Sequence, residues 1–321
     1  MAQSANLPPL EVMPPDISQY RSGNTDIDYV TTIDSGLPGP HVVIMALTHG
    51  NEICGAYAMN YLFKNEVRPT HGILTLAFNN VAAFDRFDPA QPFASRFVDE
   101  DFNRVWTDEI LQSGRDSVEL ARARKLLPIV RSADFLLDIH SMHLASPPLL
   151  MCGMKDKNVK LGVGMGYPAH MVRDWGHTNG RRMRDYNEFD DPASPKLSML
   201  VECGQHWALS SIEVAIQSAL RFLRFTGVVD AAWCDARINP AAEEQKLIDV
   251  DGPITIKTSN FRFVMEYTGL EVIREKGSVI GHDGGEEVRT PFDDCVLIMP
   301  GRNLVPGLSA VRLGRYAPLP G

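Results

Sequence analysis

The stretch HVVIMALTHGNE, residues 41–52, decides the fold because it joins a buried strand to a polar turn. Its first part, His41–Leu47, is a short apolar run rich in β-branched residues, which is typical of a strand covered on both faces. The residues after the strand, Asn51–Asn65, carry apolar side chains at three- and four-residue spacing, as an amphipathic helix packed on a sheet requires. This strand–turn–helix unit predicts an α/β fold.

The same alternation of short apolar runs and longer helical patterns continues from about residue 28 to residue 231. Further strands are predicted at Gly72–Ala77, Phe135–Ile139, Leu149–Cys152 and Leu197–Val201. Further helices are predicted at Ser117–Val130 and Ser211–Phe225. Between them, Phe84–Val105 lacks a sustained period and predicts a long ordered loop, a kind of segment that is often functional.

The pattern changes after Asn239 and Pro240, where helical periodicity stops and short runs bounded by glycine begin. These runs are ITIKT, FRFVMEY, LEVI, SVIG and CVLIMP, within residues 254–300. Short strands at such spacing predict a small barrel or sandwich. We therefore predict two domains, an α/β domain over residues 1–240 and an all-β domain over residues 241–321.

The composition of the 321-residue chain is that of a globular protein, with 44% hydrophobic and 22% charged residues. A net charge of −9 argues against nucleic-acid binding, which needs clustered Lys and Arg. No run approaches the roughly 18 apolar residues of a membrane span, and no secretory signal opens the chain, so we predict a cytoplasmic protein. Five scattered cysteines without a CxxC pair indicate reduced thiols. The sequence is also compatible with a homo-oligomer.

His49 and Glu52 lie three residues apart at the turn between the first strand and its helix, where both can meet one metal ion. Catalytic zinc sites take three protein ligands from His and Asp or Glu, and leave one position for water. His140 supplies a third ligand because FLLDIH again places a histidine just past a buried strand. Asp138 or the backbone can orient that histidine. The pattern predicts one Zn²⁺ per chain.

Glu202 follows the same rule, since LSMLVE places it at the end of another apolar run. In an open α/β sheet the carboxyl ends of the strands converge on one crevice, so these side chains are expected to meet. The alternative is that His49 and His140 are hydrogen-bonded core residues and that Glu202 caps a helix. His143 is an alternative to His140, although it lies farther from the strand end.

The ordered motifs THGNE, DFNR at residues 101–104, DIH and VECG resemble those of the succinylglutamate desuccinylase and aspartoacylase family. That family belongs to the zinc carboxypeptidase-like hydrolases. The resemblance runs from about His41 to Trp207 and continues more loosely through the tail. It implies a mixed-sheet catalytic domain followed by a small all-β domain, and a deacylase acting on linear amides.

The resemblance also implies roles for individual residues. By its motifs, the zinc ligands are His49, Glu52 and His140, while Glu202 activates the metal-bound water and Arg96 polarises the scissile carbonyl. General chemistry agrees, because zinc lowers the pKa of its water from about 15.7 to about 7 and a carboxylate can then take the proton. A cation beside the zinc can stabilise the negative charge on the carbonyl oxygen.

Asn103 and Arg104 match the pair that grips the substrate carboxylate in the family, and a guanidinium is a planar fork suited to that group. The family can draw a further anion-binding arginine from the loop before Glu202. Here that loop holds Arg181, Arg182 and Arg184, and the sequence does not choose among them. Cys54 and Cys203 adjoin the predicted site, but burial beside apolar neighbours makes a thiolate nucleophile unexpected.

We therefore expect hydrolysis of the amide bond of an N-acyl amino acid or related acylated amine, with a small carboxylate-bearing substrate. The alternatives are a zinc carboxypeptidase acting on peptides and a non-catalytic carrier or scaffold with a vestigial site. Residues 269–307 resemble a lipoyl- or biotinyl-carrier barrel, yet no Met-Lys-Met stands at a hairpin tip. The tail is therefore expected to narrow the mouth of the site instead of carrying a prosthetic group.

Overall fold

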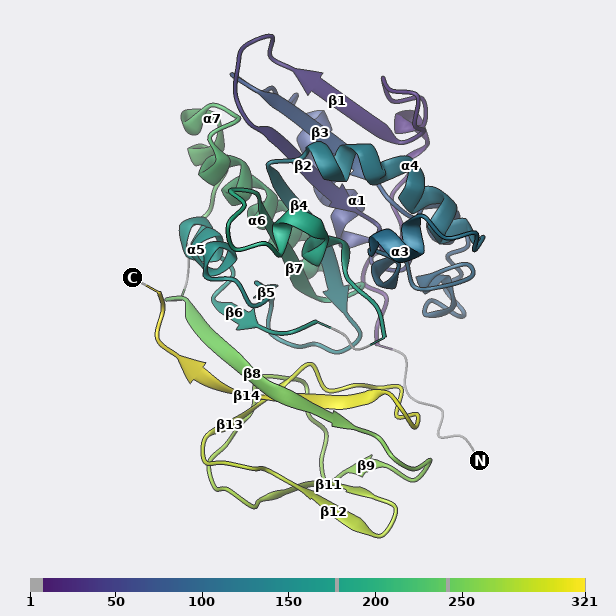
Figure 1. The fold of residues 1–321 in the computed structure, drawn as a ribbon, viewed down its shortest axis with the longest axis vertical. Helices are drawn as coiled ribbons and strands as arrows, with labels where there is room; N and C mark the ends of the chain where they lie inside the picture. Colours follow the sequence, from purple (N-terminus) through teal and green to yellow (C-terminus); the bar gives the residue numbers. More distant parts are fainter. Residues whose placement is uncertain (1–7, 177–178, 241–242, 321) are drawn as a thin grey trace.

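The computed structural model describes residues 8–176, 179–240 and 243–320. Helices surround one sheet in the first part of the chain, and the tail is built from strands that lie below it in Figure 1. The expected α/β class with an all-β tail is confirmed for the described residues.

The first part of the chain contributes seven strands to one large sheet, in the order β1-β3-β2-β4-β7-β5-β6. Their bounds are β1 Val30–Asp34, β2 His41–Ala46, β3 Ile73–Phe78, β4 Phe135–Met142, β5 Leu149–Met151, β6 His170–Arg173 and β7 Leu197–Gln205. Strand β2 pairs in parallel with β3 and β4, and β4 pairs in parallel with β7. Strands β1 and β5 run antiparallel to their neighbours β3 and β7. The sheet is therefore mixed, as expected.

Helices cover both faces of this sheet, which explains why its central strands contain long buried apolar runs. One core contains residues of α1 (Cys54–Lys64), α5 (Asp156–Met165) and α6 (Leu209–Thr226). The second core contains residues of α4 (Val118–Ser132). Successive residues of β2 alternate between the two cores, because side chains along a strand point to opposite faces.

The remaining helices of the described chain are short. The α-helical ones are α2 (Val81–Phe84), α3 (Asp108–Leu111) and α7 (Ala231–Asp235). The 3₁₀ turns are η1 (Ser18–Tyr20), η2 (Ala94–Arg96), η3 (Phe102–Arg104), η4 (Met183–Asp185) and η5 (Asn187–Phe189). Turns η2 and η3 lie in the long segment predicted as an ordered loop, and that prediction is confirmed. None of the helices in the described ranges has the length and apolar character needed to cross a membrane.

The tail extends the large sheet and adds a second one. Its strands are β8 (Lys246–Thr255), β9 (Arg262–Phe263), β10 (Val272–Ile273), β11 (Val279–Asp283), β12 (Glu286–Arg289), β13 (Cys295–Ile298) and β14 (Ser309–Ala317). Strand β8 pairs in parallel with β6, and the sheet continues through β14, β13 and β10. Strands β12, β11 and β9 form the separate antiparallel sheet. The predicted boundary at residue 241 touches residues outside the described ranges and stays a prediction.

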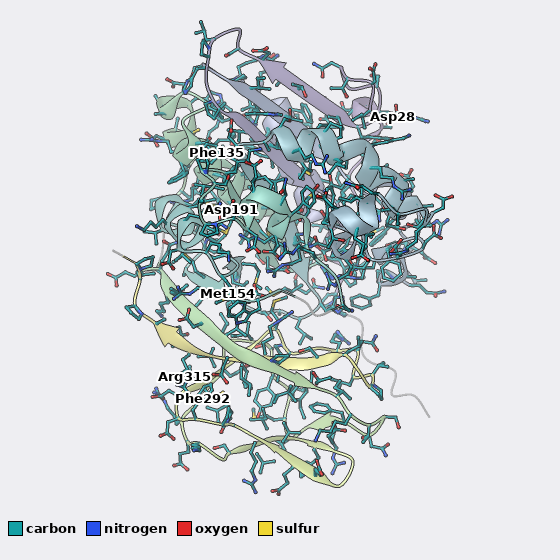
Figure 2. All side chains as sticks on the ribbon, in the orientation of Figure 1. Asp28, Phe135, Met154, Asp191, Phe292 and Arg315 are labelled. Atoms are coloured by element: carbon teal, nitrogen blue, oxygen red, sulfur yellow. The ribbon has the colours of Figure 1, made fainter. Side chains whose placement is uncertain are left out.

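Side chains of the two tail sheets pack against each other (Figure 2). Ile280 of β11, Leu297 of β13 and Leu313 of β14 belong to one buried cluster. On the outside, the guanidinium of Arg315 lies 3.7 Å from the ring centroid of Phe292. The segment FRFVMEY was expected to be a strand throughout, but only Arg262–Phe263 is extended in a ladder.

Candidate metal centre and the adjoining cavity

The turn after β2 has a backbone shape that few residues adopt. Leu47 has φ 61°, a left-handed conformation that costs energy for a side chain of this kind. Gly50 follows in close contact with the next layer, since a Cβ there would lie 2.5 Å from the carbonyl oxygen of Ser95. The tight turn places His49 and Glu52 on the same side, above the start of α1.

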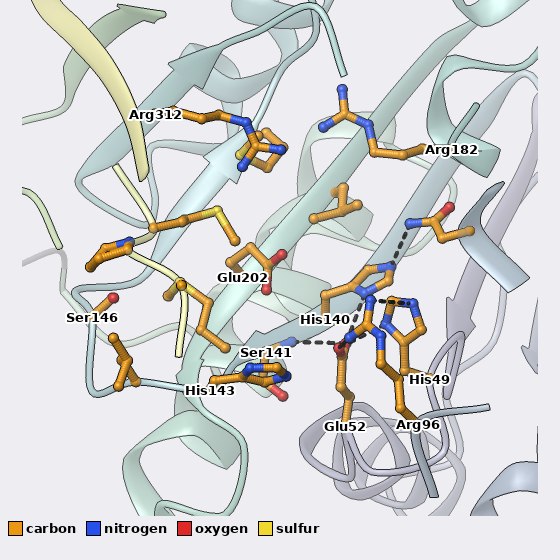
Figure 3. Close-up of a pocket in the computed structure, with 18 of the residues that line it drawn as sticks. His49, Glu52, Arg96, His140, Ser141, His143, Ser146, Arg182, Glu202 and Arg312 are labelled. Carbon is orange, nitrogen blue, oxygen red and sulfur yellow. Dashed lines mark hydrogen bonds and ion pairs between the residues drawn. The ribbon is translucent and has the colours of Figure 1, made fainter. Parts of the chain in front are cut away.

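Two histidines and a carboxylate converge at this turn (Figure 3). His49 Nδ1 lies 2.7 Å from Glu52 Oε1, and His140 Nδ1 lies 2.7 Å from Glu52 Oε2. The candidate ligand atoms of the three residues all lie within 4.8 Å of one another, and all three side chains are buried. The structure therefore brings together the three residues predicted to bind zinc.

Each histidine is oriented by a second carboxylate through its other ring nitrogen. His140 Nε2 lies 2.8 Å from Asp138 Oδ2, which confirms the expected contact with Asp138. His49 Nε2 lies 2.9 Å from Asp101 Oδ1. Asp101 was not singled out from the sequence, although it opens the DFNR motif. Such carboxylate partners fix the ring orientation of metal-binding histidines.

This donor set fits a zinc ion. Two imidazole nitrogens and one carboxylate are the ligands of many catalytic zinc sites, and ligands must be deprotonated to bind. Burial alone would raise the pKa of Glu52, but His49 and His140 outweigh it and hold the pKa well below its usual range. Glu52 is thus ionised in this setting, as a ligand requires.

Arg96 reaches His49, Glu52 and Asp101 from η2. Its Nη2 lies 2.9 Å from His49 Nε2 and 3.0 Å from Asp101 Oδ2, while its Nη1 donates to Glu52 Oε1 at 3.3 Å. A guanidinium is therefore held at the edge of the candidate metal position. The long loop places Arg96 there because η2 packs against the Gly50 turn, with Gly50 N–H donating to the carbonyl of Arg96.

Glu202 lies on β7 directly beside His140 of β4, because the two residues are partners in the parallel ladder. Its side chain lines the cavity next to the candidate metal position (Figure 3). Within the described part of the chain, its Oε2 has no hydrogen-bond partner. Burial, and then the charge of Glu52, raise the pKa of Glu202 to about 8. This carboxyl can therefore gain and lose a proton near neutral pH.

The adjoining cavity has a volume of about 210 Å³. Asn103 and Arg104 line it from η3, and Asn103 Nδ2 lies 3.5 Å from His140 Nε2. The side chain of Asn103 is fixed from behind, since its Oδ1 accepts the backbone N–H of Met183 at 2.8 Å. Arg104 packs closely on Gly180, since a Cβ at that glycine would lie 2.5 Å from the carbonyl oxygen of Arg104.

The structure distinguishes the three arginines that the sequence left open. Arg182 lines the cavity and forms two hydrogen bonds with Asp174, at 2.8 and 3.1 Å. Arg184 is buried behind the wall, where its Nη2 donates to the carbonyl of Cys152 at 2.8 Å. Arg181 lies at the surface in an ion pair. Arg182 is therefore the arginine of this loop that can meet a ligand.

The rival residues take other places. His143 lines the cavity, but its ring packs against Phe93 and His206, with centroids 5.0 Å apart in each pair. Burial lowers the pKa of His143 to about 4. Cys54 and Cys203 are both buried, and burial raises the pKa of Cys203 well above its usual value. A thiolate nucleophile is therefore unsupported here.

Residues of the tail complete the cavity wall, and none of them was predicted from the sequence as part of the site. Met299, Pro300 and Gly301 line it from the segment after β13, and Arg312 lines it from β14. These contacts support the expectation that the tail narrows the mouth. No sequence motif marks Arg312, so only the pairing of β14 with its neighbours could reveal its place.

Comparison with known proteins points to one family. Residues 38–167 match the family model of the succinylglutamate desuccinylase/aspartoacylase catalytic domain. A succinylglutamate desuccinylase of Pseudoalteromonas atlantica is 25% identical over 316 residues, covering 84% of this chain and 79% of that protein. A probable aspartoacylase of Parasynechococcus marenigrum is 36% identical over 86 residues, and this match spans only 27% of each chain.

The fold similarity covers more of the chain than the family model does. The crystal structure of a succinylglutamate desuccinylase from Vibrio cholerae superposes with a TM-score of 0.66 at 14% identity. The superposition covers 90% of this chain and 86% of that one, so it includes the tail as well as the helical part. The chain is therefore similar to the succinylglutamate desuccinylase/aspartoacylase family, in sequence over residues 38–167 and in fold over most of its length.

Proposed function

We propose that the protein is a zinc-dependent amidohydrolase that removes the acyl group of an N-acyl amino acid or a related acylated amine. The observation that carries the proposal is the convergence of His49, Glu52 and His140 beside the carboxyl of Glu202. The relatives support it, because desuccinylases and aspartoacylases are amidohydrolases. The three convergent side chains would hold the metal.

A bound Zn²⁺ would polarise the scissile carbonyl and lower the pKa of a water ligand to about 7. Glu202 would take a proton from the attacking water and pass it to the leaving nitrogen, acting first as base and then as acid. Its raised pKa, about 8, suits a group that must do both near neutral pH. Arg96 would stabilise the negative charge that develops on the carbonyl oxygen.

Asn103 and Arg104 would bind the carboxylate of the amino acid. The Arg104 side chain is only 18% exposed, so its hydrogen bonds to a carboxylate would form in a partly desolvated site and be stronger than at a surface. Asn103 lies between this guanidinium and the ring of His140, which brings the bound carboxylate close to the reacting centre. An acylated amine without a carboxylate would lose these contacts.

A carboxypeptidase with the same zinc site is the second candidate, because its ligands would be the same. The cavity volume of about 210 Å³ favours a small substrate over a peptide chain. Met299, Pro300 and Gly301 add to this limit by forming part of the wall. A non-catalytic scaffold is disfavoured, since the full set of three candidate ligands and the carboxyl of Glu202 is present and lies together.

The test is hydrolysis of acetylated, succinylated and formylated amino acids by zinc-loaded protein, measured as release of the free amine. Carboxyl-amidated analogues and short peptides with free C-termini serve as comparison substrates. We expect turnover of acyl amino acids, with at least tenfold lower kcat/KM for the amidated analogues. Faster release from peptides would support the carboxypeptidase instead. No release from any acyl amino acid would refute the proposal.

A further inference from the structure

A buried carboxyl group at the start of α4 contacts the loop that carries the arginines of the site. Glu119 is the second residue of α4, and it is fully buried. Among the described residues, it does not belong to those that line the cavity. A buried carboxyl group is costly unless hydrogen bonds compensate for the lost water, so its partners indicate its role.

The partners of Glu119 are three consecutive backbone N–H groups and one side-chain amide. Its Oε1 accepts hydrogen bonds from the N–H of Val98 at 2.7 Å and from Asn80 Nδ2 at 2.9 Å. Its Oε2 accepts hydrogen bonds from the N–H groups of Asp99 at 3.0 Å and Glu100 at 3.2 Å. Each oxygen thus accepts two hydrogen bonds, which uses the acceptor capacity of the carboxyl group.

The contact between the loop and α4 is reciprocal. Asp99 Oδ2 accepts the N–H of Val118 at 2.8 Å, and Glu100 Oε1 accepts the hydroxyl of Ser117, the N-cap residue of α4, at 2.6 Å. Residues 98–100 and the first turn of α4 therefore form one hydrogen-bonded unit, which we call the loop clamp.

Hydrophobic packing does little to fix this part of the loop. Phe97 is 38% exposed, and no side chain of residues 97–100 belongs to a buried hydrophobic cluster within the described part of the chain. The flanking residues Ser95 and Phe102 are buried. The hydrogen bonds of the loop clamp therefore fix the position of the four-residue bridge, residues 97–100.

The bridge joins the two parts of the loop that bring guanidinium groups to the cavity. Arg96 immediately precedes it, and Asp101, which opens the DFNR motif, immediately follows it. Arg96 Nη2 lies 3.0 Å from Asp101 Oδ2, so the two ends of the bridge meet. A shift of the bridge would therefore move Arg96 and the DFNR residues together.

Asn80 connects the loop clamp to the turn between β2 and α1. The backbone N–H of Asn80 donates to the carbonyl of Leu47 at 2.9 Å, and Leu47 lies two residues before His49. The side chain of Asn80 donates to Glu119. Glu119 thus relates the position of the bridge to the turn that carries two of the candidate metal ligands.

We propose that Glu119 is a positioning residue, which places Arg96 beside the candidate metal position by holding the bridge and does not touch the substrate. The inference rests on the proposed function, in which Arg96 stabilises the charge on the carbonyl oxygen. A displacement of about 1 Å caused by a mutation far from the chemistry can lower a rate on the order of 10²-fold. The loss of this contact should therefore be measurable as a loss of turnover.

The first experiment uses Glu119→Gln, which keeps the size of the side chain and replaces one oxygen by an NH₂ group. In either orientation of the amide, two of the four donors then face another donor, and their hydrogen bonds are lost. We expect kcat/KM for acyl amino acids to fall by roughly tenfold or more. The zinc content should remain about one per chain.

Glu109→Gln is the matched control, because it removes the same charge from an exposed glutamate of α3. Its kcat/KM should stay within about twofold of wild type. A Glu119→Gln protein with the kcat/KM of the control would overturn the inference.

A double-mutant cycle separates positioning from a general structural defect. Arg96→Ala removes the group through which Glu119 acts, so adding Glu119→Gln to it should lower kcat/KM by less than about twofold more. Losses that multiply in the double variant overturn the inference. If Glu119→Gln does not fold, Asp99→Ala decides in its place by the same cycle, because Asp99 is exposed and its loss breaks the reciprocal bond to Val118.

Backbone hydrogen exchange separates this inference from the proposed function, because it needs no substrate. In zinc-loaded protein, Glu119→Gln should speed exchange in peptides covering residues 96–104 by roughly tenfold or more, and leave peptides covering β2 and β4 unchanged. That pattern supports the loop clamp even if no acyl amino acid is hydrolysed. Unchanged exchange over residues 96–104 overturns the inference and leaves the proposed function intact. An equal rise in all peptides overturns it as well.

Discussion

Two neighbouring carboxyl groups in the site have opposite environments, and this difference separates their roles. Glu52 lies between the Nδ1 atoms of His49 and His140, which hold its pKa well below the usual range. Burial and the charge of Glu52 raise the pKa of Glu202 to about 8. Pairs of carboxyls whose pKa values are driven apart are typical of sites where one binds and the other moves protons. We therefore assign metal binding to Glu52 and proton transfer to Glu202.

Replacing Glu202 by glutamine tests this assignment, because the side chain keeps its shape and loses the ability to exchange a proton. Glu202→Gln should bind about one zinc per chain and lose turnover by roughly 10²–10⁴-fold, the usual contribution of general acid–base catalysis. Elemental analysis measures the zinc content, and kcat measures the loss of turnover. His140→Ala is the comparison variant and should lose the metal. A Glu202→Gln protein that no longer binds zinc would make Glu202 a ligand.

The sequence predicts residues of the site where each one comes directly after a buried apolar run, although β4 and β7 extend beyond these runs and include His140 and Glu202. His49, His140 and Glu202 could be found in this way, because parallel strands bring their carboxyl ends to the same edge of the sheet. Arg312 could not be found, since it lies inside a strand and its position depends on pairing with β8 and β13. Asp101 lies in a recognised motif, but its contact with His49 depends on how the loop folds.

The element that most constrains the site is the turn between β2 and α1. Gly50 lies against the backbone of α2 and the η2 segment, so a methyl group there would overlap with the main chain of Ala83 and Ser95. Main-chain atoms cannot rotate away as a side chain would. The turn therefore has little freedom to move, and His49 and Glu52 move with it.

The variant Gly50→Ala should lower the free energy of unfolding by about 1–3 kcal/mol, the usual cost of overpacking. It should also weaken zinc binding. Gly114→Ala is the matched control, because a Cβ at Gly114 meets nothing within 4 Å and its backbone is unstrained. Scanning calorimetry gives the stability, and zinc titration gives the affinity. If Gly50→Ala and the wild-type protein have equal stability and equal zinc affinity, the turn accommodates the added methyl group.

Among the elements, the buried parallel strands were predictable and the partly exposed ones were not. Strands β2, β4 and β7 have long apolar runs because both of their faces are covered. Strand β1 is mostly half-buried and polar, and β6 has only four residues, so neither has a clear pattern. Helix α5 contains Gly162, which is unfavourable in a helix, but a Cβ there would lie 2.7 Å from the sulfur of Met171.

On the scale of the whole molecule, the tail is joined to the first part through the sheet itself. Strand β8 pairs with β6 in parallel, and the large sheet then continues through β14 and β13. The cavity wall therefore includes residues from both ends of the sequence, from His49 to Arg312. The glycine-bounded runs predicted an all-β tail. They did not predict that its first strand would pair with β6 at the edge of the large sheet.

A metal that binds only the folded chain should stabilise the molecule as a whole. Its three candidate ligands come from the Gly50 turn and from β4, so binding links two central elements of the sheet. Free zinc at a hundredfold excess over its dissociation constant would add about 2.7 kcal/mol, provided that the unfolded chain does not bind it. The protein should therefore melt several degrees higher with zinc than after exhaustive chelation.

His140→Ala is the control for this measurement, because it removes one ligand and should remove the zinc-dependent shift. Chelation should also abolish amide hydrolysis by the wild-type protein, and added zinc should restore it. The melting shift and the activity should then follow the same dependence on zinc concentration, since one site controls both. A wild-type protein with full activity and an unchanged melting temperature after chelation would contradict the metal assignment, because His49, Glu52 and His140 would then hold the fold together without an ion.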